Sequence, residues 1–528
     1  MKKRLPIGID TFEKLITGNH VYIDKTKIAL ELINSSPYYF LSRPRRFGKS
    51  LFIDTLHCLF EGRKELFKDL YIHDNYDWKQ TYPVIKISFA EGTIHSRKEL
   101  DKKIIRILKD NQKKLEVDCD DNSDVAGCFG DLIALTQKKT GRNVVVLVDE
   151  YDKPILDNIT DIETANEIRD GLRNLYSVIK GKDRYLHFAF LTGVSKFSKV
   201  SLFSGLNNLK DITLDRRYST ICGYTQSDVE TSFTEYLEGV DLEKLKEWYN
   251  GYSWLGESVY NPFDILLFLD SPGKEYKNYW FETATPNFLI TLLKDNNYYL
   301  PNLENLEMTE LDLGSFEVEN LKLETLLFQT GYLTIKKEEL LLDKYIYQVD
   351  FPNKEVKTSL NEYLFKFFTS IEHHQSIPYY RALISDNFPA QKNHLYTLFE
   401  SIPYNNFTNN KMYEKEGYYA SVIYAYFASL GMELIAEDVT NKGRIDLTMK
   451  FPGNEKIYIF EFKVLINNDT GKKPLEQIKK MGYAKKYTGL RNSAGKPPEI
   501  YIIGIEFSRE KRNICAFEWE KLCFSKLH

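Results

Sequence analysis

The stretch Arg43-Pro44-Arg45-Arg46-Phe47-Gly48-Lys49-Ser50 follows the apolar run Tyr38–Ser42 and precedes the helical stretch Leu51–Phe60. A phosphate-binding loop wraps backbone N–H groups around phosphate oxygens at a helix N-terminus, with a lysine on the terminal phosphates and a hydroxyl on Mg²⁺. Gly48-Lys49-Ser50 supplies that core, although the usual pattern has glycine where Arg43 stands. The sequence therefore predicts a nucleotide site formed by Arg45, Arg46, Phe47, Gly48, Lys49, Ser50 and Leu51.

Two adjacent acids, Asp149 and Glu150, end the apolar run Val144–Val148. Such a pair is costly at a buried strand end unless a cation or a polar cleft receives it. We expect Asp149 to hold Mg²⁺ together with Ser50, and Glu150 to orient or deprotonate the attacking water. Thr192, at the end of the next apolar run, is placed to sense the γ-phosphate.

A plainer interpretation of this region remains open. The loop is then a basic turn in which Arg45 and Arg46 face solvent, and the acids of the strand end form salt bridges. Arg216 and Arg217 are candidates for an arginine finger, and they are equally well explained as surface arginines.

A second acidic pattern lies near the other end of the chain, where Asp446 precedes Glu461-Phe462-Lys463. Residues two apart in a strand project to the same side about 7 Å apart, so Glu461 and Lys463 project together. Asp446 and Glu461 would hold Mg²⁺ while Lys463 positions or activates water, and Gln477 and Glu416 would close the site. The alternative is a hairpin edge with a Glu–Lys ion pair, which contributes little to stability.

The order of apolar and helical stretches predicts an α/β protein with several parts. Residues 1–222 alternate strands and helices as in a P-loop NTPase domain with a mostly parallel sheet. We expect a helical lid over 223–310 and a winged-helix-like module over 311–400. The segment 401–528 has the order αβββαβ.

Charge and cysteine content narrow the class of protein. The net charge of −4 divides into +5 for residues 401–528 (20 Lys and Arg against 15 Asp and Glu) and −9 for the rest. A mildly basic end is compatible with contact to phosphate. The six cysteines form no C-x-x-C pair, which predicts reduced thiols in a cytoplasmic protein. Neither a signal peptide nor a membrane span is expected.

Four stretches resemble one known family: Leu5-Pro6-Ile7-Gly8-Ile9-Asp10, Tyr22-Ile23-Asp24-Lys25-Thr26, residues 40–51 and Asp149-Glu150-Tyr151-Asp152. They resemble bacterial AAA-ATPase-like proteins, which typically carry a C-terminal PD-(D/E)xK nuclease-type domain of restriction-endonuclease-like fold. The resemblance covers the whole chain, and the arginine-rich loop is then the family's own variant. It implies ATP binding, with Tyr22, Asp24 and Lys25 near the base or ribose.

The leading hypothesis is a protein that binds and hydrolyses ATP, coupled to a Mg²⁺-dependent DNA nuclease domain. A second hypothesis is an ATP-dependent switch whose C-terminal domain binds nucleic acid or a partner protein without cutting. A third is a nuclease whose nucleotide site binds without turnover. Nucleic acid, most simply DNA, is the expected partner, no membrane contact is expected, and an oligomer is compatible with the sequence.

Overall fold

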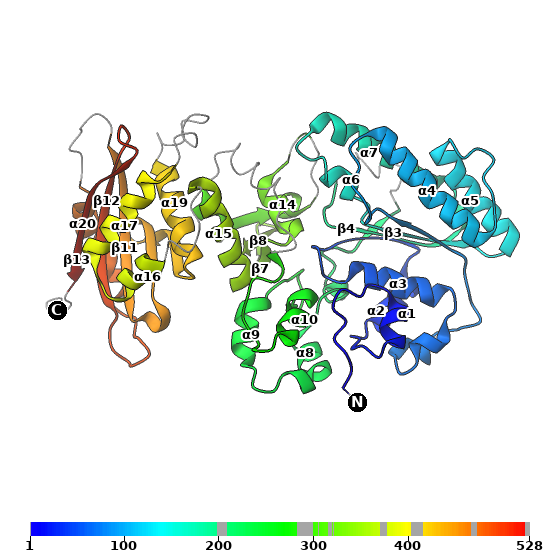
Figure 1. The fold of residues 1–528 in the computed structure, drawn as a ribbon, viewed down its shortest axis with the longest axis horizontal. Helices are drawn as coiled ribbons and strands as arrows, with labels where there is room; N and C mark the ends of the chain where they lie inside the picture. The colour runs from blue at the N-terminus through cyan, green and yellow to red at the C-terminus, as the bar shows by residue number, and fades with distance from the viewer. Residues whose placement is uncertain are drawn as a thin grey trace. The chain divides into compact units, whose positions relative to one another are not determined.

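The structure, a computed structural model, describes residues 2–197, 208–281, 299–304, 306–314, 319, 321–369, 377–402, 416–465 and 473–522. The chain divides into two compact units. The first comprises Met1–Phe288 and Glu307–Asn353, and the second comprises Leu289–Leu306 and Lys354–His528 (Figure 1). Within the described residues, no helix is long and apolar enough to cross a membrane.

A five-stranded parallel sheet forms the centre of the first unit, with strand order β2-β3-β4-β1-β5. Its strands are β1 (Tyr38–Ser42), β2 (Val84–Ser88), β3 (Val144–Asp149), β4 (Leu186–Gly193) and β5 (Lys210–Asp211). Every residue of β1 and β3 is buried, as expected where helices cover both faces of a parallel sheet. This confirms the predicted P-loop-like α/β sheet, and it places β4 between β1 and β3.

Helices lie on both faces of this sheet. One face carries α4 (Arg97–Leu115), α5 (Val125–Thr140) and α7 (Ile162–Gly181), with the short α6 (Lys153–Leu156) beside them (Figure 1). The other carries α1 (Phe12–Thr17), α2 (Thr26–Ser35) and α3 (Lys49–Phe60). Side-chain caps fix the starts of α4 and α7: Ser96 accepts from Glu99 N before α4. Asp161 accepts from Thr164 N before α7.

Three further helices of the first unit pack against its N-terminal segment. They are α8 (Gln226–Ser232), α9 (Leu242–Tyr249) and α10 (Pro262–Asp270). Thr225 caps α8 in a capping box with Asp228, which fixes the start of this helix. Their buried side chains form one core with Val21 and Ile23, so the N-terminal segment and the helices are held together.

The first unit ends in a small helix-and-hairpin module. It contains α13 (Glu310–Leu313), α14 (Leu323–Thr330) and a three-stranded sheet of order β6-β8-β7. Its strands are β6 (Leu306–Thr309), β7 (Thr334–Leu341) and β8 (Lys344–Asp350). The order along the chain is strand, two helices, and then the two strands of the hairpin, and the winged-helix-like module expected over 311–400 stays a prediction.

The second unit is built on a mixed sheet of order β13-β12-β11-β10-β9. Its strands are β9 (Glu433–Thr440), β10 (Gly443–Lys450), β11 (Lys456–Leu465), β12 (Glu499–Ser508) and β13 (Asn513–Leu522). Only β11 and β12 run parallel. Phe427 of α19 (Glu416–Ser429) contacts Phe460 of β11, whereas Ile478 of α20 (Pro474–Met481) packs with Ile459 of β11 in a separate core. The mixed α/β fold predicted for this part of the chain is confirmed, and β13 adds one strand to the expected order αβββαβ.

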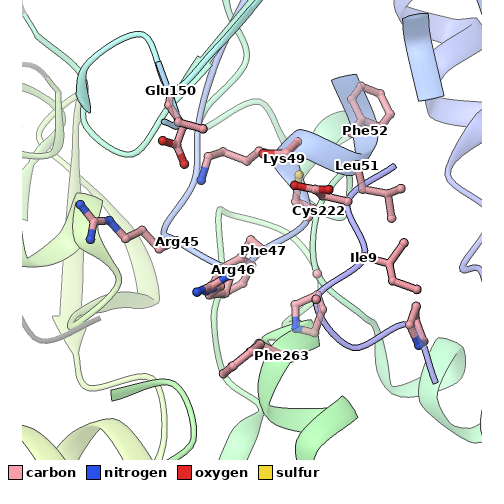
Figure 2. A pocket seen from close by; sticks show the side chains of 18 of the residues that line it. Ile9, Arg45, Arg46, Phe47, Lys49, Leu51, Phe52, Glu150, Cys222 and Phe263 are labelled. Carbon is pink, nitrogen blue, oxygen red and sulfur yellow. The ribbon is translucent and has the colours of Figure 1, made fainter. Parts of the chain in front are cut away.

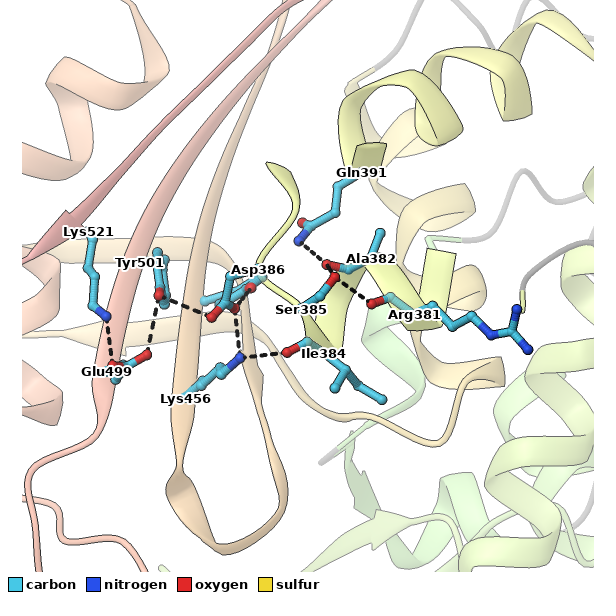
Figure 3. A network of polar contacts seen from close by, with 11 residues as sticks. Arg381, Ala382, Ile384, Ser385, Asp386, Gln391, Lys456, Glu499, Tyr501 and Lys521 are labelled. Carbon is cyan, nitrogen blue, oxygen red and sulfur yellow. Dashed lines mark hydrogen bonds and ion pairs between the residues drawn. The ribbon is translucent and has the colours of Figure 1, made fainter. Parts of the chain in front are cut away.

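The helices α15 (Lys354–Thr369), α16 (Ile377–Ile384) and α17 (Phe388–Glu400) belong to this second unit. Asp386, between α16 and α17, accepts hydrogen bonds from Lys456 at 2.7 Å and from Tyr458 at 2.9 Å (Figure 3). Phe388 stacks on Trp519 with ring centroids 4.1 Å apart. These contacts join α16 and α17 to the sheet of the second unit. The division of the chain into the parts 1–222, 223–310, 311–400 and 401–528 stays a prediction.

One pair of cysteines departs from the sequence expectation. Cys119 and Cys128 form a disulfide, with Cα atoms 5.0 Å apart, so the prediction of reduced thiols is wrong at this pair. The two residues come together because the chain turns back between α4 and α5. Their spacing is not C-x-x-C, so the sequence pattern did not predict the bond. Among the other described cysteines, Cys58, Cys222 and Cys515 are free thiols.

Candidate active sites

The loop between β1 and α3 has the backbone of a phosphate-binding loop. Arg46 and Gly48 have φ values of 69° and 91°, and α3 begins directly after Gly48. The first N–H groups of α3 have no carbonyl partner within the helix and point toward the loop, so its N-terminus favours an anion.

Arg43 explains how this loop departs from the usual glycine pattern. Its side chain is fully buried, and Nη1 donates to the carbonyl oxygens of Ser42 at 2.8 Å and Thr213 at 2.9 Å. The guanidinium also lies 4.1 Å from the Trp254 ring, and burial lowers its pKa to about 10. Arg43 therefore anchors the base of the loop and does not face the nucleotide cavity.

A cavity of 660 Å³ opens beside the loop, a volume within the range of small-molecule pockets. The predicted residues that line it are Arg45, Arg46, Phe47, Gly48, Lys49, Ser50, Leu51 and Glu150 (Figure 2). Tyr22 and Lys25 also line it, whereas Asp24 accepts from Thr26 N at 2.8 Å just before α2. Among the described residues, Asp149 and Thr192 do not line the cavity.

The cavity is lined by both apolar and charged side chains. Ile9 of the N-terminal segment and Phe263 of α10 are among the apolar ones, and the Arg46 guanidinium lies 5.1 Å from the Phe263 ring. Lys49 and Glu150 point toward one another (Figure 2).

Lys49 is held by its own loop. It is nearly buried, and its Nζ donates to the carbonyl oxygen of Pro44 at 2.8 Å. Burial lowers the pKa of Lys49, an effect that the carboxylates of Asp149 and Glu150 oppose. Burial also raises the pKa of Glu150, which Lys49 partly offsets.

The chain after β4 is held by Asp152, an acid to which no local sequence pattern assigns a role. Asp152 is buried and accepts from Ser195 N at 2.6 Å, from Ser195 Oγ at 2.5 Å and from Val194 N at 3.1 Å. Thr192 is fully buried, and its hydroxyl donates to the carbonyl oxygen of Leu41 at 2.9 Å. Val194, which lines the cavity, and not Thr192 is therefore the residue of this segment nearest the nucleotide space.

In the second unit, Asp446 and Glu461 lie across from one another on neighbouring strands. The ladder between β10 and β11 pairs Leu447 with Phe460, and Asp446 and Glu461 are the next positions along it. Asp446 Oδ2 accepts from Phe462 N at 2.7 Å, and the buried Glu461 accepts from the Gln477 amide through Oε1. Asp446, Glu461 and Gln477 are thus linked through hydrogen bonds on β11.

A close approach of α20 to the sheet brings Gln477 there. Gly504 of β12 pairs with Glu461, and a Cβ added to Gly504 would lie 2.6 Å from Leu475 N at the start of α20. A side chain at this position would therefore hold α20 away from β11. Tyr483 follows α20 and lies beside the same carboxylates: burial raises its pKa, and Glu461 and Asp446 act in the same direction.

Lys463 and Glu416 are the remaining predicted residues of this site. Lys463 is half-buried on β11, two positions after Glu461 and paired in register with Glu506. Glu416 begins α19, but its side chain lies outside the described residues.

Comparison with known proteins identifies the family. The chain matches the family model described as "Predicted AAA-ATPase" over residues 6–203, and a PD-(D/E)XK nuclease superfamily model over residues 414–517. An "Uncharacterized protein in vnfD 5'region" of Azotobacter chroococcum mcd 1 is 48% identical over 525 residues, 99% of either chain. The chain belongs to this AAA-ATPase-like family. No solved structure matches it.

The AAA-ATPase-like domain has groups that fit a Mg²⁺ ion beside a nucleotide. Asp149 is buried, and within the described part of the chain its Oδ1 accepts no hydrogen bond. Ser50 stands at the start of α3 on the cavity wall. A buried carboxylate oxygen without a donor is stabilised by a cation or its water, so this pair suits the ion.

The arginine-finger candidates of the AAA-ATPase-like domain are engaged elsewhere. Arg216 pairs with Glu338 of β7, and Arg217 pairs with Asp215 at 2.5 Å. Both side chains are exposed, and neither lines the cavity. In this structure Arg216 and Arg217 are therefore surface arginines, as the alternative interpretation of the sequence has them.

Proposed function

We propose that this AAA-ATPase-like protein binds ATP with Mg²⁺ in the cavity beside α3, hydrolyses it, and cleaves DNA at the nuclease-superfamily site. One observation supports nucleotide binding and hydrolysis most directly: Lys49 and Glu150 point toward one another in the cavity, beside the N-terminus of α3. Lys49 would leave the Pro44 carbonyl for the β- and γ-phosphates, and Glu150 would accept a proton from the attacking water. Ser50 and Asp149 would hold Mg²⁺, which neutralises the charge of the phosphates.

The nuclease half is supported by the juxtaposition of Asp446, Glu461 and Gln477. Two carboxylates on adjacent strands suit a divalent cation, which when bound stabilises the charge that develops on the scissile phosphate. Gln477 orients Glu461 through its amide, and Lys463 would position the attacking water on the same side of β11. A mildly basic C-terminal segment is compatible with a polynucleotide substrate.

A cleavage assay with full-length protein tests the nuclease half. Supercoiled plasmid is incubated with Mg²⁺ or Mn²⁺, with and without ATP, and DNA binding is followed in parallel by fluorescence anisotropy. Asp446→Asn keeps an acceptor for Phe462 N, and Lys463→Met keeps side-chain length, so both should bind DNA and lose cleavage. Lys496→Met, at an exposed loop position, is the matched control and should cleave normally.

The same assay separates the alternative. ATP hydrolysis that is lost in Lys49→Met, together with DNA binding but no cleavage under any metal condition, would favour an ATP-dependent switch that does not cut. Cleavage that persists in Asp446→Asn would overturn the assignment of this site.

A further inference from the structure

The helix-and-hairpin module of the first unit touches the phosphate loop directly. Gly331, which ends α14 with a φ of 92°, packs its Cα against Pro44. A Cβ added to Gly331 would lie 2.7 Å from Pro44 Cγ and 2.8 Å from Pro44 Cβ. Real Cβ atoms do not approach so closely, so any side chain at Gly331 displaces Pro44 or the module.

A second contact continues along the same loop. Tyr332, next to Gly331, lies with its ring 5.1 Å from the ring of Trp280, and Trp280 Nε1 donates to the carbonyl oxygen of Arg45 at 3.3 Å. Pro44 and Arg45 are therefore both bordered by the module or by a residue packed on it. Pro44 is also the residue whose carbonyl holds Lys49.

The module touches the chain after β4 as well. Gln329, two residues before Gly331, is buried, and its Oε1 accepts from Lys196 N at 2.7 Å. Its Nε2 donates to the carbonyl oxygen of Gly314 at 2.6 Å, which fixes the orientation of the amide. Lys196 follows Ser195, the residue that Asp152 holds.

The order of the strands places the Gly331–Pro44 contact and the Gln329–Lys196 contact beside different parts of the proposed nucleotide site. Because β4 lies between β1 and β3, the segment that leaves β4 emerges between the phosphate loop and the carboxylates of Asp149 and Glu150. A terminal phosphate with its Mg²⁺ would occupy that space. The loop itself would surround the phosphates that ATP and ADP share.

We propose that Gly331 and Gln329 are positioning residues of the nucleotide site, an inference that rests on the nucleotide binding proposed above. Gly331 sets the position of Pro44, and with it the loop that binds phosphates common to ATP and ADP. Gln329 sets the position of Lys196 and so of the segment Val194–Lys196. Val194 would border the terminal phosphate. The two residues thus govern different parts of the nucleotide.

Gly331→Ala tests the first role against Gly141→Ala. Gly141 also has a left-handed backbone, with a φ of 67°, but no atom lies within 4 Å of an added Cβ. Both variants carry the strain of alanine at positive φ, and only Gly331→Ala crowds the loop. Binding of fluorescent ATP and ADP analogues should weaken roughly 10-fold for both nucleotides in Gly331→Ala, and remain as in the parent in Gly141→Ala.

Gln329→Met tests the second role against Gln348→Met, a change on the exposed side of β8. Methionine keeps the volume of Gln329 and removes the acceptor for Lys196 N. The affinity for the ATP analogue should fall roughly 10-fold while that for the ADP analogue changes less than about twofold, because only the terminal phosphate meets the displaced segment. Melting temperatures of the apo variants show whether each is folded, and a purely structural role would not change the ratio of ATP to ADP affinity.

Each result decides the inference. Equal nucleotide affinities for Gly331→Ala and Gly141→Ala, or an unchanged ATP-to-ADP ratio in Gln329→Met, would overturn the corresponding role while leaving nucleotide binding intact. A parent protein that binds neither analogue would overturn the proposed function, and this inference with it.

Discussion

The ammonium group of Lys49 donates to the carbonyl oxygen of Pro44, five residues earlier in its own loop, at 2.8 Å. The loop is therefore closed by an internal hydrogen bond that a phosphate oxygen would have to replace. Since both states would give Lys49 a partner, the proposed nucleotide binding would replace the Pro44 carbonyl with a charged phosphate oxygen, a stronger acceptor.

Replacement of Lys49 by methionine should weaken ATP binding by roughly 10- to 100-fold, the range for a lost hydrogen bond to a charged group. The measurement is a binding titration with a fluorescent ATP analogue. Lys64→Met, at an exposed position beyond α3, is the control and should bind as the parent does. Unchanged affinity in Lys49→Met would contradict the placement of the phosphates.

Glu150 should give ATP hydrolysis a dependence on pH. Burial raises the pKa of its carboxyl above the ordinary value of a glutamate, so the group stays protonated to higher pH than usual. A protonated carboxyl accepts no proton from water, and hydrolysis should therefore rise as pH increases through the raised pKa and fall below it.

The matched pair Glu150→Gln and Glu163→Gln checks this role, since Glu163 is exposed at the start of α7. Phosphate release should slow about 10²- to 10⁴-fold in Glu150→Gln, with nucleotide binding retained and the rise with pH gone. Release at the parental rate in this variant would assign the proton transfer to another group.

Gly504→Ala should impair cleavage more than stability. The added Cβ would lie 2.6 Å from Leu475 N, so α20 must move outward and take Gln477 from Glu461. Displacement by about 1 Å is expected to lower the cleavage rate roughly 100-fold. Gly489→Ala, where no atom lies within 4 Å of the new Cβ, is the control, and equal plasmid cleavage in both would argue against this support of the site.

Reduction of the Cys119–Cys128 bond should lower the free energy of unfolding of the first unit by about 2.5 kcal/mol, the chain-entropy value for so short a loop. Urea unfolding with and without reductant measures the effect, and a double Cys→Ala variant at both positions should not respond to reductant. Titration of six free thiols in denatured, unreduced protein would show that the bond does not form.

Local patterns indicated those parts of both candidate sites that depend on a single strand and the element after it. The loop before α3 was indicated by Gly48-Lys49-Ser50 between an apolar run and a helical stretch, and the acids ending β3 by an apolar run that ends in charged residues. The Asp446–Glu461 pair was indicated by the Glu461-Phe462-Lys463 spacing and the order of the strands. Gln477 was expected near this site only because its helix follows the strand of Glu461 in the chain. In the structure α20 lies against the sheet, and the Gln477 amide donates to Glu461.

Partners that come from distant segments were not predictable in the same way. Gln329 reaches Lys196 across 133 residues of sequence, and no local pattern marks it. Thr192 was assigned from its place at a strand end, but a hydroxyl there can face either the cavity or the neighbouring strand, and it bonds to Leu41. Asp152 belongs to one of the stretches that resemble the family. Its hydrogen-bond partners Val194 and Ser195 follow β4, so the motif alone could not identify them.

Arg43 also bears on how such loops are recognised in other genomes. Within Arg43–Ser50, positive φ occurs at Arg46 and Gly48 only, so the backbone itself makes no demand for glycine at the opening position. A large cation is accommodated there because neighbouring main-chain oxygens and an indole receive it. Searches that insist on two glycines will pass over proteins of this kind, whereas a pattern requiring one glycine before the lysine, preceded by a strand and paired with a distant acidic strand end, would retrieve them.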